Sequence, residues 1–245
     1  MGTHKIIMKK IKKALISVSD KKNLKNLLKI LSRHKVELIS SGGTYKEIKK
    51  LKFKCLEVSE YTNSPEILGG RVKTLHPKIH AGILSKRNNN SHKNDLKNNN
   101  FEEIDLVIVN FYPFEKTLEK TKNHLKILEN IDVGGPTMVR AAAKNYNDVT
   151  VITSPSQYDE LIKQIKKNKG STSLNFREKM SLEAFSETAY YDSVISNYFN
   201  HISKNNFPKK KIIYANLIEK LRYGENPHQE SSIYSKTKNL SIQQI

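Results

Sequence analysis

Hydroxyl-bearing and small residues follow two apolar stretches of this sequence. Ser17 to Lys21 comes after the stretch that begins at Ala14, and Ser40 to Thr44 comes after the stretch that begins at Val36. Such residues beside the start of a helix favour an anion, because backbone N–H groups and the helix dipole face it there. Each turn alone more often serves as a helix cap. Because the two turns are expected at adjacent strand ends, a phosphate site and a pair of simple helix caps are about equally favoured interpretations.

Two further segments combine groups that suit acid–base and oxyanion chemistry. Residues 69–77 read Gly-Gly-Arg-Val-Lys-Thr-Leu-His-Pro, and residues 130–137 read Asn-Ile-Asp-Val-Gly-Gly-Pro-Thr before a helical stretch that reaches Lys144. A solvated loop is the alternative for the first segment, although such loops seldom alternate cations and an imidazole with Val and Leu. Between the two, Asn110 and Tyr112 end an apolar stretch, and a buried amide needs hydrogen-bond partners.

The histidines and the single cysteine give no comparable pattern. His34, His80, His92 and His124 have no metal-ligand spacing, and Cys55 lies in an expected strand, where a core role fits better than a nucleophile. One cysteine excludes a disulfide framework and a Cys-based zinc cluster, and a reducing, cytoplasmic setting is the default.

The charge balance is strongly basic, with 43 Lys and Arg against 24 Asp and Glu, a formal net charge of +19. Such an excess attracts nucleic-acid phosphates, but only six of these residues are arginines, which read bases and phosphates in a bidentate way. The lysines are dispersed among many Asn and Ile, all encoded by A/T-rich codons, so compositional bias is the better explanation and we expect no specific nucleic-acid partner. No run reaches the ~18 apolar residues of a membrane span, so we expect no membrane association.

The chemical residues need a scaffold that brings distant turns together, and the hydrophobic pattern predicts one. Apolar strands alternate with amphipathic helices, which indicates an α/β fold with a doubly wound, mostly parallel sheet, whose ligands gather at the carboxyl ends of the strands. The expected strands are Ala14–Ser19, Val36–Ser41, Phe53–Val58, Leu106–Tyr112 and Val149–Thr153; the expected helices are Leu24–Leu31, a short one capped by Thr44, Gln157–Lys167 and Ser173–Phe199 with Leu182, Phe185, Ala189 and Tyr190 on recurring positions.

The remaining segments set the expected domain boundaries. Residues 1–13 are basic without a targeting pattern and are expected to form an N-terminal extension. Residues 14–202 hold the α/β domain, in which Asn88 to Asn100 is expected to be a mobile polar loop. Residues 203–245 begin with a polar linker and continue into the turn-rich stretch from Leu221 to Gln229.

At these motifs the sequence resembles a known family, the bifunctional purine-biosynthesis enzymes that join a formyltransferase to inosine monophosphate cyclohydrolase. The matching stretches follow the family's order over about residues 12–230. They are residues 14–21, 41–44, 70–77, 130–137, 139–145 and 188–192, of which Arg71 to Pro77 and Asp132 to Lys144 are specific.

The resemblance implies a methylglyoxal-synthase-like fold and one reaction. The reaction is ring closure of 5-formamidoimidazole-4-carboxamide ribotide to inosine monophosphate with loss of water. Such chemistry needs no cofactor, but it needs a cation where the oxyanion develops and a proton shuttle. Position by position, the resemblance makes Lys73, Tyr112, Asp132 and Lys144 catalytic. It assigns Asn110, Thr74 and Gly134 to the base, and Ser19, Lys21, Ser41, Gly43, Thr44 and Arg71 to the 5′-phosphate.

The family's second domain, a formyltransferase that uses 10-formyltetrahydrofolate, is expected to be present here only as its opening, Leu221 to Gln229. A homodimer is typical of the family, and the resemblance leaves open which oligomer this chain forms. Three alternatives stay open: a regulatory phosphate- or nucleotide-binding module on the same fold, methylglyoxal synthase itself, and a lysine-rich nucleic-acid binder. The first has no need for four catalytic residues, the second lacks the 71–77 stretch, and scattered lysines argue against the third.

Overall fold

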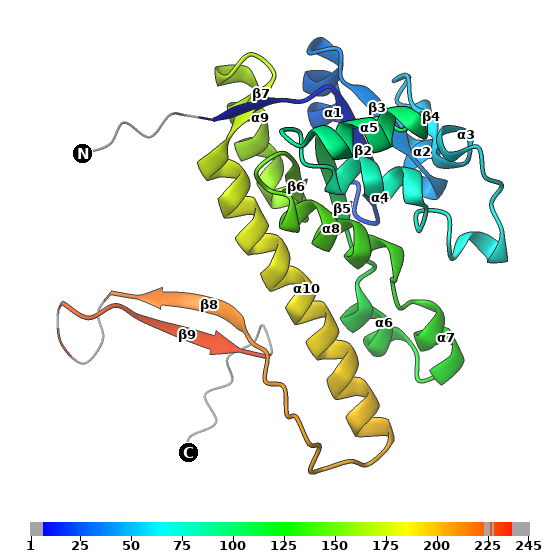
Figure 1. Cartoon of the computed structure of the whole chain (residues 1–245). Helices are drawn as coiled ribbons and strands as arrows, with labels where there is room; N and C mark the ends of the chain where they lie inside the picture. The colour runs from blue at the N-terminus through cyan, green and yellow to red at the C-terminus, as the bar shows by residue number, and fades with distance from the viewer. Residues whose placement is uncertain (1–6, 223–225, 227, 237–245) are drawn as a thin grey trace. The chain divides into compact units, whose positions relative to one another are not determined.

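The computed structural model describes residues 7–222, 226 and 228–236, and the chain divides into two compact units, residues 1–188 and 189–245. The first unit is built on a five-stranded sheet in the order β4-β3-β2-β5-β6 (Figure 1). All neighbouring strands are parallel. They are β2 (Lys13–Val18), β3 (Glu37–Ser40), β4 (Leu56–Glu57), β5 (Leu106–Asn110) and β6 (Thr150–Ile152).

The strand order places the switch of winding direction between β2 and β5. From β2 the chain moves outward to β3 and β4, then returns to β5 on the other side of β2 and continues to β6. Ala14 lies opposite Leu38 on one neighbour and Leu106 on the other. In doubly wound sheets, ligands bind beyond the carboxyl ends of the strands at this point. The fold therefore singles out the turns after Val18 and Asn110.

The two central strands are buried because both of their faces are covered. Leu15 and Ile16 of β2 and Val107 and Ile108 of β5 are at most 1% exposed, as the near-continuous apolar runs of a parallel sheet require. The flanking helices are α1 (Leu24–Arg33), α2 (Gly42–Lys50), α3 (Val58–Thr62), α4 (Pro77–Leu84), α5 (Asn90–Asn98), α6 (Phe114–Lys120), α7 (His124–Glu129), α8 (Gly134–Lys144), α9 (Tyr158–Lys167) and α10 (Leu174–Ile202), with 3-10 turns η1 (Leu68–Gly70) and η2 (Pro155–Gln157). The predicted α/β class is confirmed.

The start of the chain contributes more to the fold than the sequence indicated. Residues 1–6 lie outside the described part, but β1 (Met8–Lys10) pairs antiparallel with β7 (Ser171–Ser173). Ile11 is 2% exposed, and its N–H donates to the Gly170 carbonyl at 2.9 Å. The expectation of an extension through residue 13 is therefore wrong from Met8 onward. Ile11 is a core residue, but the lysines on both sides of it gave the segment a polar pattern.

Three other expectations need correction. The polar stretch after Asn88 forms helix α5, because the Asn89 side chain accepts from His92 N at its start and Leu96 is buried. The third strand is shortened to β4. Thr44 does not cap α2, which begins at Gly42; its hydroxyl bonds to β2 instead.

Helix α10 confirms the predicted helix but not its expected apolar face. Leu182 is 69% exposed and Phe185 is 39% exposed, whereas Phe176, Met180 and Ala184 are buried. The apolar residues of this helix occur on more than one face, so spacing alone did not identify the side that packs.

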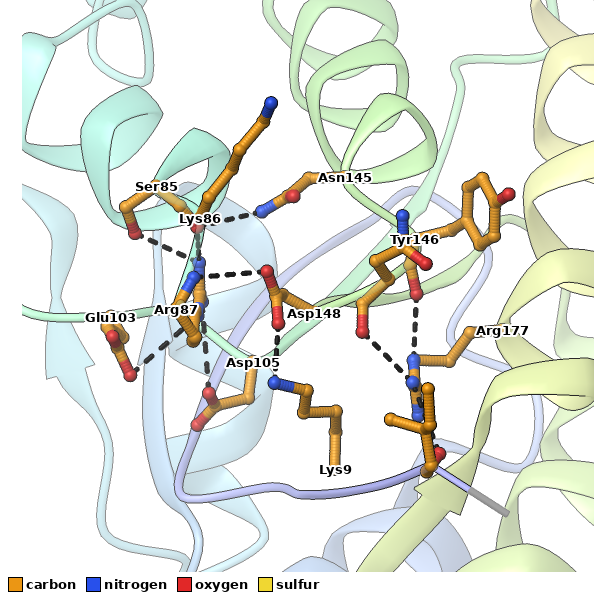
Figure 2. A network of polar contacts seen from close by, with 12 residues as sticks. Lys9, Ser85, Lys86, Arg87, Glu103, Asp105, Asn145, Tyr146, Asp148 and Arg177 are labelled. Atoms are coloured by element: carbon orange, nitrogen blue, oxygen red, sulfur yellow. Dashed lines mark hydrogen bonds and ion pairs between the residues drawn. The ribbon is translucent and has the colours of Figure 1, made fainter. Parts of the chain in front are cut away.

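A polar network surrounds the amino ends of β5 and β6 (Figure 2). The Arg87 guanidinium lies 3.8 Å from the Asp105 carboxylate and 3.7 Å from that of Glu103, and its backbone N–H donates to Asp148. Lys9 pairs with the other oxygen of Asp148 at 2.6 Å. This network connects β1 and the turn after α4 to the amino ends of β5 and β6, which lie at the end of the sheet opposite to the carboxyl ends of the strands.

Arg177 anchors the other half of the same network. Its side chain is fully buried, and its guanidinium donates to the Tyr146 carbonyl at 2.8 Å (Figure 2). It also donates to the carbonyls of Asn147 and Thr172 at 3.0 and 2.6 Å. Burial lowers the pKa of Arg177 to about 10, which still leaves it charged at neutral pH. The loop that follows α8 is thus held through its backbone.

The second unit holds the last part of α10 and an antiparallel hairpin of β8 (Asn216–Leu221) and β9 (Ser231–Ser235). Tyr190 and Tyr214 meet edge to face at 5.2 Å, and the Asn216 amide donates to the Tyr190 hydroxyl at 2.9 Å. Residues 223–225 and 227 of the Leu221–Gln229 motif, and residues 237–245, lie outside the described part. No helix among the described residues is long and apolar enough to cross a membrane.

Candidate functional site

A cavity of about 800 Å³ opens at the carboxyl ends of β2 and β5, where the sheet changes winding direction. All of the residues nominated from the sequence except Lys144 line it: Ser19, Lys21, Ser41, Gly43, Thr44, Arg71, Lys73, Thr74, Asn110, Tyr112, Asp132 and Gly134. The fold therefore brings five separate segments of the sequence to one place. A volume of this size is ample for a nucleotide-sized ligand.

The turn between β3 and α2 forms one side of the cavity lining. The Thr44 hydroxyl accepts from Val18 N and lies 2.9 Å from the Val18 carbonyl, so it fastens the first turn of α2 to the end of β2. Ser41 occupies the cap position but makes no side-chain cap bond, which leaves its hydroxyl and the helix N–H groups for an anion. Gly42 has φ +54°, a conformation that suits glycine.

Asn110 holds the neighbouring turn in place. Its side-chain oxygen accepts from the backbone N–H groups of Ser19 and Asp20 at 2.7 and 2.9 Å, and its amide nitrogen donates to the Asp20 carbonyl at 3.0 Å. The Ser19 hydroxyl lies 2.9 Å from the same oxygen and 2.6 Å from the Phe111 carbonyl. The amide that the sequence nominated for base recognition is used here to orient the Ser19 turn.

Lys73 lies between two glycines. A Cβ on Gly42 would lie 2.9 Å from the Lys73 ammonium, and one on Gly70, where φ is +85°, would lie 3.4 Å from it. The ammonium is 3.8 Å from the Glu66 carboxylate. Lys73 and Ser41 also line a smaller cavity of about 190 Å³. Small residues on both sides thus leave room for a cation next to the first turn of α2.

Arg71 and Glu129 form an ion pair at the mouth of the cavity. Arg71 follows η1, and Glu129 is the last residue of α7, so the pair joins two segments that are distant in the sequence. Both side chains are largely exposed, at 66% and 61%. Glu129 is a lining residue that the sequence reasoning missed, because an acidic residue at the end of a short helix fits no motif.

Asp132 is a partly buried carboxylate just before α8. Its oxygen accepts from Gly135 N at 2.8 Å. Burial raises the pKa of Asp132 above its usual value, and the Gly135 hydrogen bond opposes that rise in part. A Cβ on Gly135 would collide with this carboxylate, and one on Gly134 would collide with the Thr74 hydroxyl. The glycine pair therefore admits two polar groups that a larger residue would displace.

Tyr112 and Lys144 take different places. Tyr112 is 58% exposed and lines the cavity at the end of β5. Lys144 is exposed at the last position of α8, whereas Gly134, the first residue of that helix, lines the cavity. At about 1.5 Å per residue, the two ends of α8 are about 15 Å apart. The prediction that Lys144 joins the catalytic group is therefore not supported by its position.

An apolar side of the cavity was also missed by the sequence reasoning. It is formed by Leu68, Leu128, Ile131, Val133 and Met138. These residues lie between or beside the nominated polar ones, where they read as ordinary core or loop positions. Among the described residues, no group of three or more His, Cys, Asp or Glu is arranged to hold a metal ion.

Comparisons with known families agree with this arrangement. The model of the MGS-like domain matches residues 23–137, and the model of the AICARFT/IMPCHase bienzyme matches residues 142–245. The first match covers most segments that line the cavity and confirms the predicted fold class.

Curated relatives carry one common name. The chain is 44% identical over 227 residues to the bifunctional purine biosynthesis protein PurH of Bradyrhizobium diazoefficiens, covering 93% of this chain and 43% of the relative. It is 48% identical over 223 residues to PurH of Prochlorococcus marinus strain MIT 9301, covering 90% and 42%. It is 43% identical over 239 residues to PurH of Elusimicrobium minutum, covering 97% and 46%. The chain thus spans less than half the length of these relatives.

A solved structure shares the architecture. The crystal structure of ForH superposes with a TM-score of 0.69 and 28% sequence identity, over 77% of this chain and 99% of that one. The resemblance that the motifs indicated is therefore found at the level of family, relatives and fold.

Proposed function

This chain belongs to the family of bifunctional purine biosynthesis proteins, and on that basis we propose that its first unit is an inosine monophosphate cyclohydrolase. The substrate is 5-formamidoimidazole-4-carboxamide ribotide, which the enzyme converts to inosine monophosphate. The observation that carries the proposal is the cavity at the winding switch, which gathers Lys73, Tyr112 and Asp132 beside a turn suited to phosphate. A soluble phosphorylated substrate fits the cytoplasmic setting expected from the sequence.

The ring closure requires proton transfers around one developing oxyanion. The carboxamide nitrogen adds to the formyl carbon and gives up one proton. The formyl oxygen takes up two protons and leaves as water, while the formamide nitrogen loses its proton as the C=N bond forms. A fixed cation near the formyl oxygen and a group that both accepts and releases protons lower the barriers to these steps.

The residues of the cavity divide between these tasks. Lys73 supplies the cation, since the glycines around it leave its ammonium room to face the cavity. Asp132 carries protons, because its raised pKa brings its two protonation states closer in energy at neutral pH. Tyr112 orients the reacting amide from the turn that follows β5. Lys144 has no part in this proposal, given its place at the far end of α8.

The rest of the cavity fits a ribotide. The Ser41–Thr44 turn, Lys21 and Arg71 suit the 5′-phosphate, because they combine helix N–H groups with two cations. The apolar side, with Leu128, Ile131 and Met138, suits the planar ring system. A phosphate at one end and a flat base at the other would hold the reacting groups in place, which is a large part of what an enzyme contributes to a ring closure.

The proposal is tested by assaying the purified 245-residue chain with the formylated ribotide and measuring inosine monophosphate by chromatography. We expect turnover, and we expect Lys73→Ala to lower kcat by about 10²–10³, the scale of one preorganised oxyanion donor. Lys116→Ala, which removes an exposed lysine of α6, is the matched control and should leave kcat unchanged. Near-normal turnover by Lys73→Ala would contradict the assignment. Nucleotide binding without any turnover would favour the regulatory module.

A further inference from the structure

The Arg71–Glu129 ion pair is a largely exposed part of the cavity lining. Both residues line the cavity, one after the glycine turn and one at the end of α7. The family resemblance implies that Arg71 is a phosphate ligand, yet in the structure its guanidinium is paired with a carboxylate of the protein. A guanidinium uses the same planar fork of N–H donors for carboxylate and phosphate. The two anions therefore compete for one group.

We propose that Glu129 is a built-in competitor of the ligand phosphate, a carboxylate that holds Arg71 at the cavity mouth and that the phosphate must displace. This inference rests on the proposed ribotide site and deepens it. Glu129 then sets how tightly the site binds anions. It discriminates against weakly charged ligands, because only a strongly charged phosphate outcompetes the carboxylate already in place.

The other charged residues of the site do not share this role. Asp132 is partly buried and accepts from Gly135 N, so its carboxylate is held at the start of α8. Lys73 has Glu66 at 3.8 Å, and Glu66 lines the smaller cavity. Glu129 is thus the lining carboxylate that the structure pairs with a nominated phosphate ligand.

Because the Arg71–Glu129 pair is exposed, its effect on ligand affinity can be measured separately from any effect on folding. Because exposed ion pairs contribute little to folding stability, Glu129→Gln should leave the melting temperature nearly unchanged. Glutamine keeps the size of the side chain but removes the charge that competes. We expect Glu129→Gln to bind inorganic phosphate and inosine monophosphate about threefold more tightly, the scale of one exposed charge pair. A structural role alone would predict equal or weaker binding.

The experiment is isothermal titration calorimetry on the full chain at fixed ionic strength, with inorganic phosphate, inosine monophosphate and inosine as probes. Inosine, which lacks phosphate, should bind Glu129→Gln and wild type equally. Glu119→Gln, which neutralises an exposed carboxylate of α6, controls for a general change in charge. In an Arg71→Met background, measured at higher ligand concentrations, Glu129→Gln should give no gain, because the pair is already absent.

The outcomes separate this inference from the proposed activity. Unchanged or weaker phosphate binding by Glu129→Gln would overturn it. So would an equal gain from Glu119→Gln, or a gain that persists in the Arg71→Met background, since either would show a long-range charge effect. If phosphate binding tightens as expected while the chain makes no inosine monophosphate, the inference about Glu129 stands and the proposed catalysis falls.

Discussion

Partial burial raises the pKa of the Asp132 carboxyl above its usual value. A carboxyl whose pKa is raised on folding retains its proton to a higher pH in the native state than in the unfolded state. In the window between the usual pKa and the raised one, the native state therefore binds more protons, and the free energy of unfolding falls as pH rises. Above that window, the partly buried carboxylate is charged and lowers the free energy of unfolding.

Asp132→Asn should accordingly stabilise the fold at neutral pH while it abolishes most ring closure. Asparagine stays uncharged, and its side-chain oxygen can still accept from Gly135 N. The stability gain should be present at pH 7 and shrink as pH falls toward 4, where the wild-type carboxyl is also neutral. Urea unfolding at several pH values measures this, with Asp95→Asn, an exposed residue of α5, as control. A gain that did not depend on pH would contradict burial as the cause.

Local motifs predicted residues that the structure brings to the lining of one cavity. Ser41 and Gly43 follow directly from a strand end that meets a helix start, so residue type and position were both readable. Lys144 does not line the cavity, because a matching motif along a helix does not show which of its residues reach the same place. Glu129 was missed because its role comes from Arg71, which is 58 residues away in the sequence.

At the scale of elements, the two hydrogen bonds between Thr44 and Val18 fasten the Ser41–Thr44 turn, the proposed phosphate site, to the end of β2. Gly43 lies in the first turn of α2, and a Cβ there would meet only the Lys21 ammonium at 3.9 Å, an ordinary contact. Gly43→Val should therefore fold with a similar melting temperature. It should weaken inosine monophosphate binding at least about tenfold, because the added group occupies the space in front of the helix N–H groups.

Binding of inosine, which has no phosphate, supplies the comparison for this variant. Inosine should bind Gly43→Val and wild type about equally in the same titration. If nucleotide affinity were equal in the two proteins, the Ser41–Thr44 turn would not be the phosphate site.

At the amino ends of the strands, Arg177 stabilises the loop after α8 and strand β7 through hydrogen bonds to their carbonyls. Replacing it with methionine leaves the carbonyls of Tyr146, Asn147 and Thr172 without their donor in a buried place. Arg177→Met should lower the free energy of unfolding by about 3 kcal/mol. Arg177→Lys, with fewer donors, should fall between, and Arg33→Met on the exposed end of α1 should change little. Urea unfolding that showed no loss for Arg177→Met would mean that the network in Figure 2 does not support the fold.

Elements with a regular apolar pattern were predictable, and those formed by long-range pairing were not. The helix with Leu24, Leu27, Leu28 and Leu31 was predicted from spacing, and all four residues are buried. Strand β1 forms only because residues 171–173 provide its partner. Helix α5 depends on a cap at Asn89 and on one buried leucine, signals that the surrounding polar sequence hides.

At the scale of the whole molecule, the net charge of the chain and the cations of the cavity are separate features. The net charge of +19 is spread over the chain, and the cations that line the cavity are only a few of these residues: Lys21, Arg71 and Lys73. The proposed chemistry thus depends on which basic residues the sheet topology gathers, and not on the total. The nominated ring-closing residues that line the cavity lie within the first unit.

The most direct test supplies the two substrates of the bienzyme family separately to the 245-residue chain. With 5-formamidoimidazole-4-carboxamide ribotide, we predict that inosine monophosphate accumulates and that Lys73→Ala suppresses it. With the unformylated ribotide and 10-formyltetrahydrofolate, we predict no formylated product, because the proposed function assigns the cavity to ring closure. Formyl transfer by this chain, or the absence of inosine monophosphate from the first incubation, would contradict the assignment of the site.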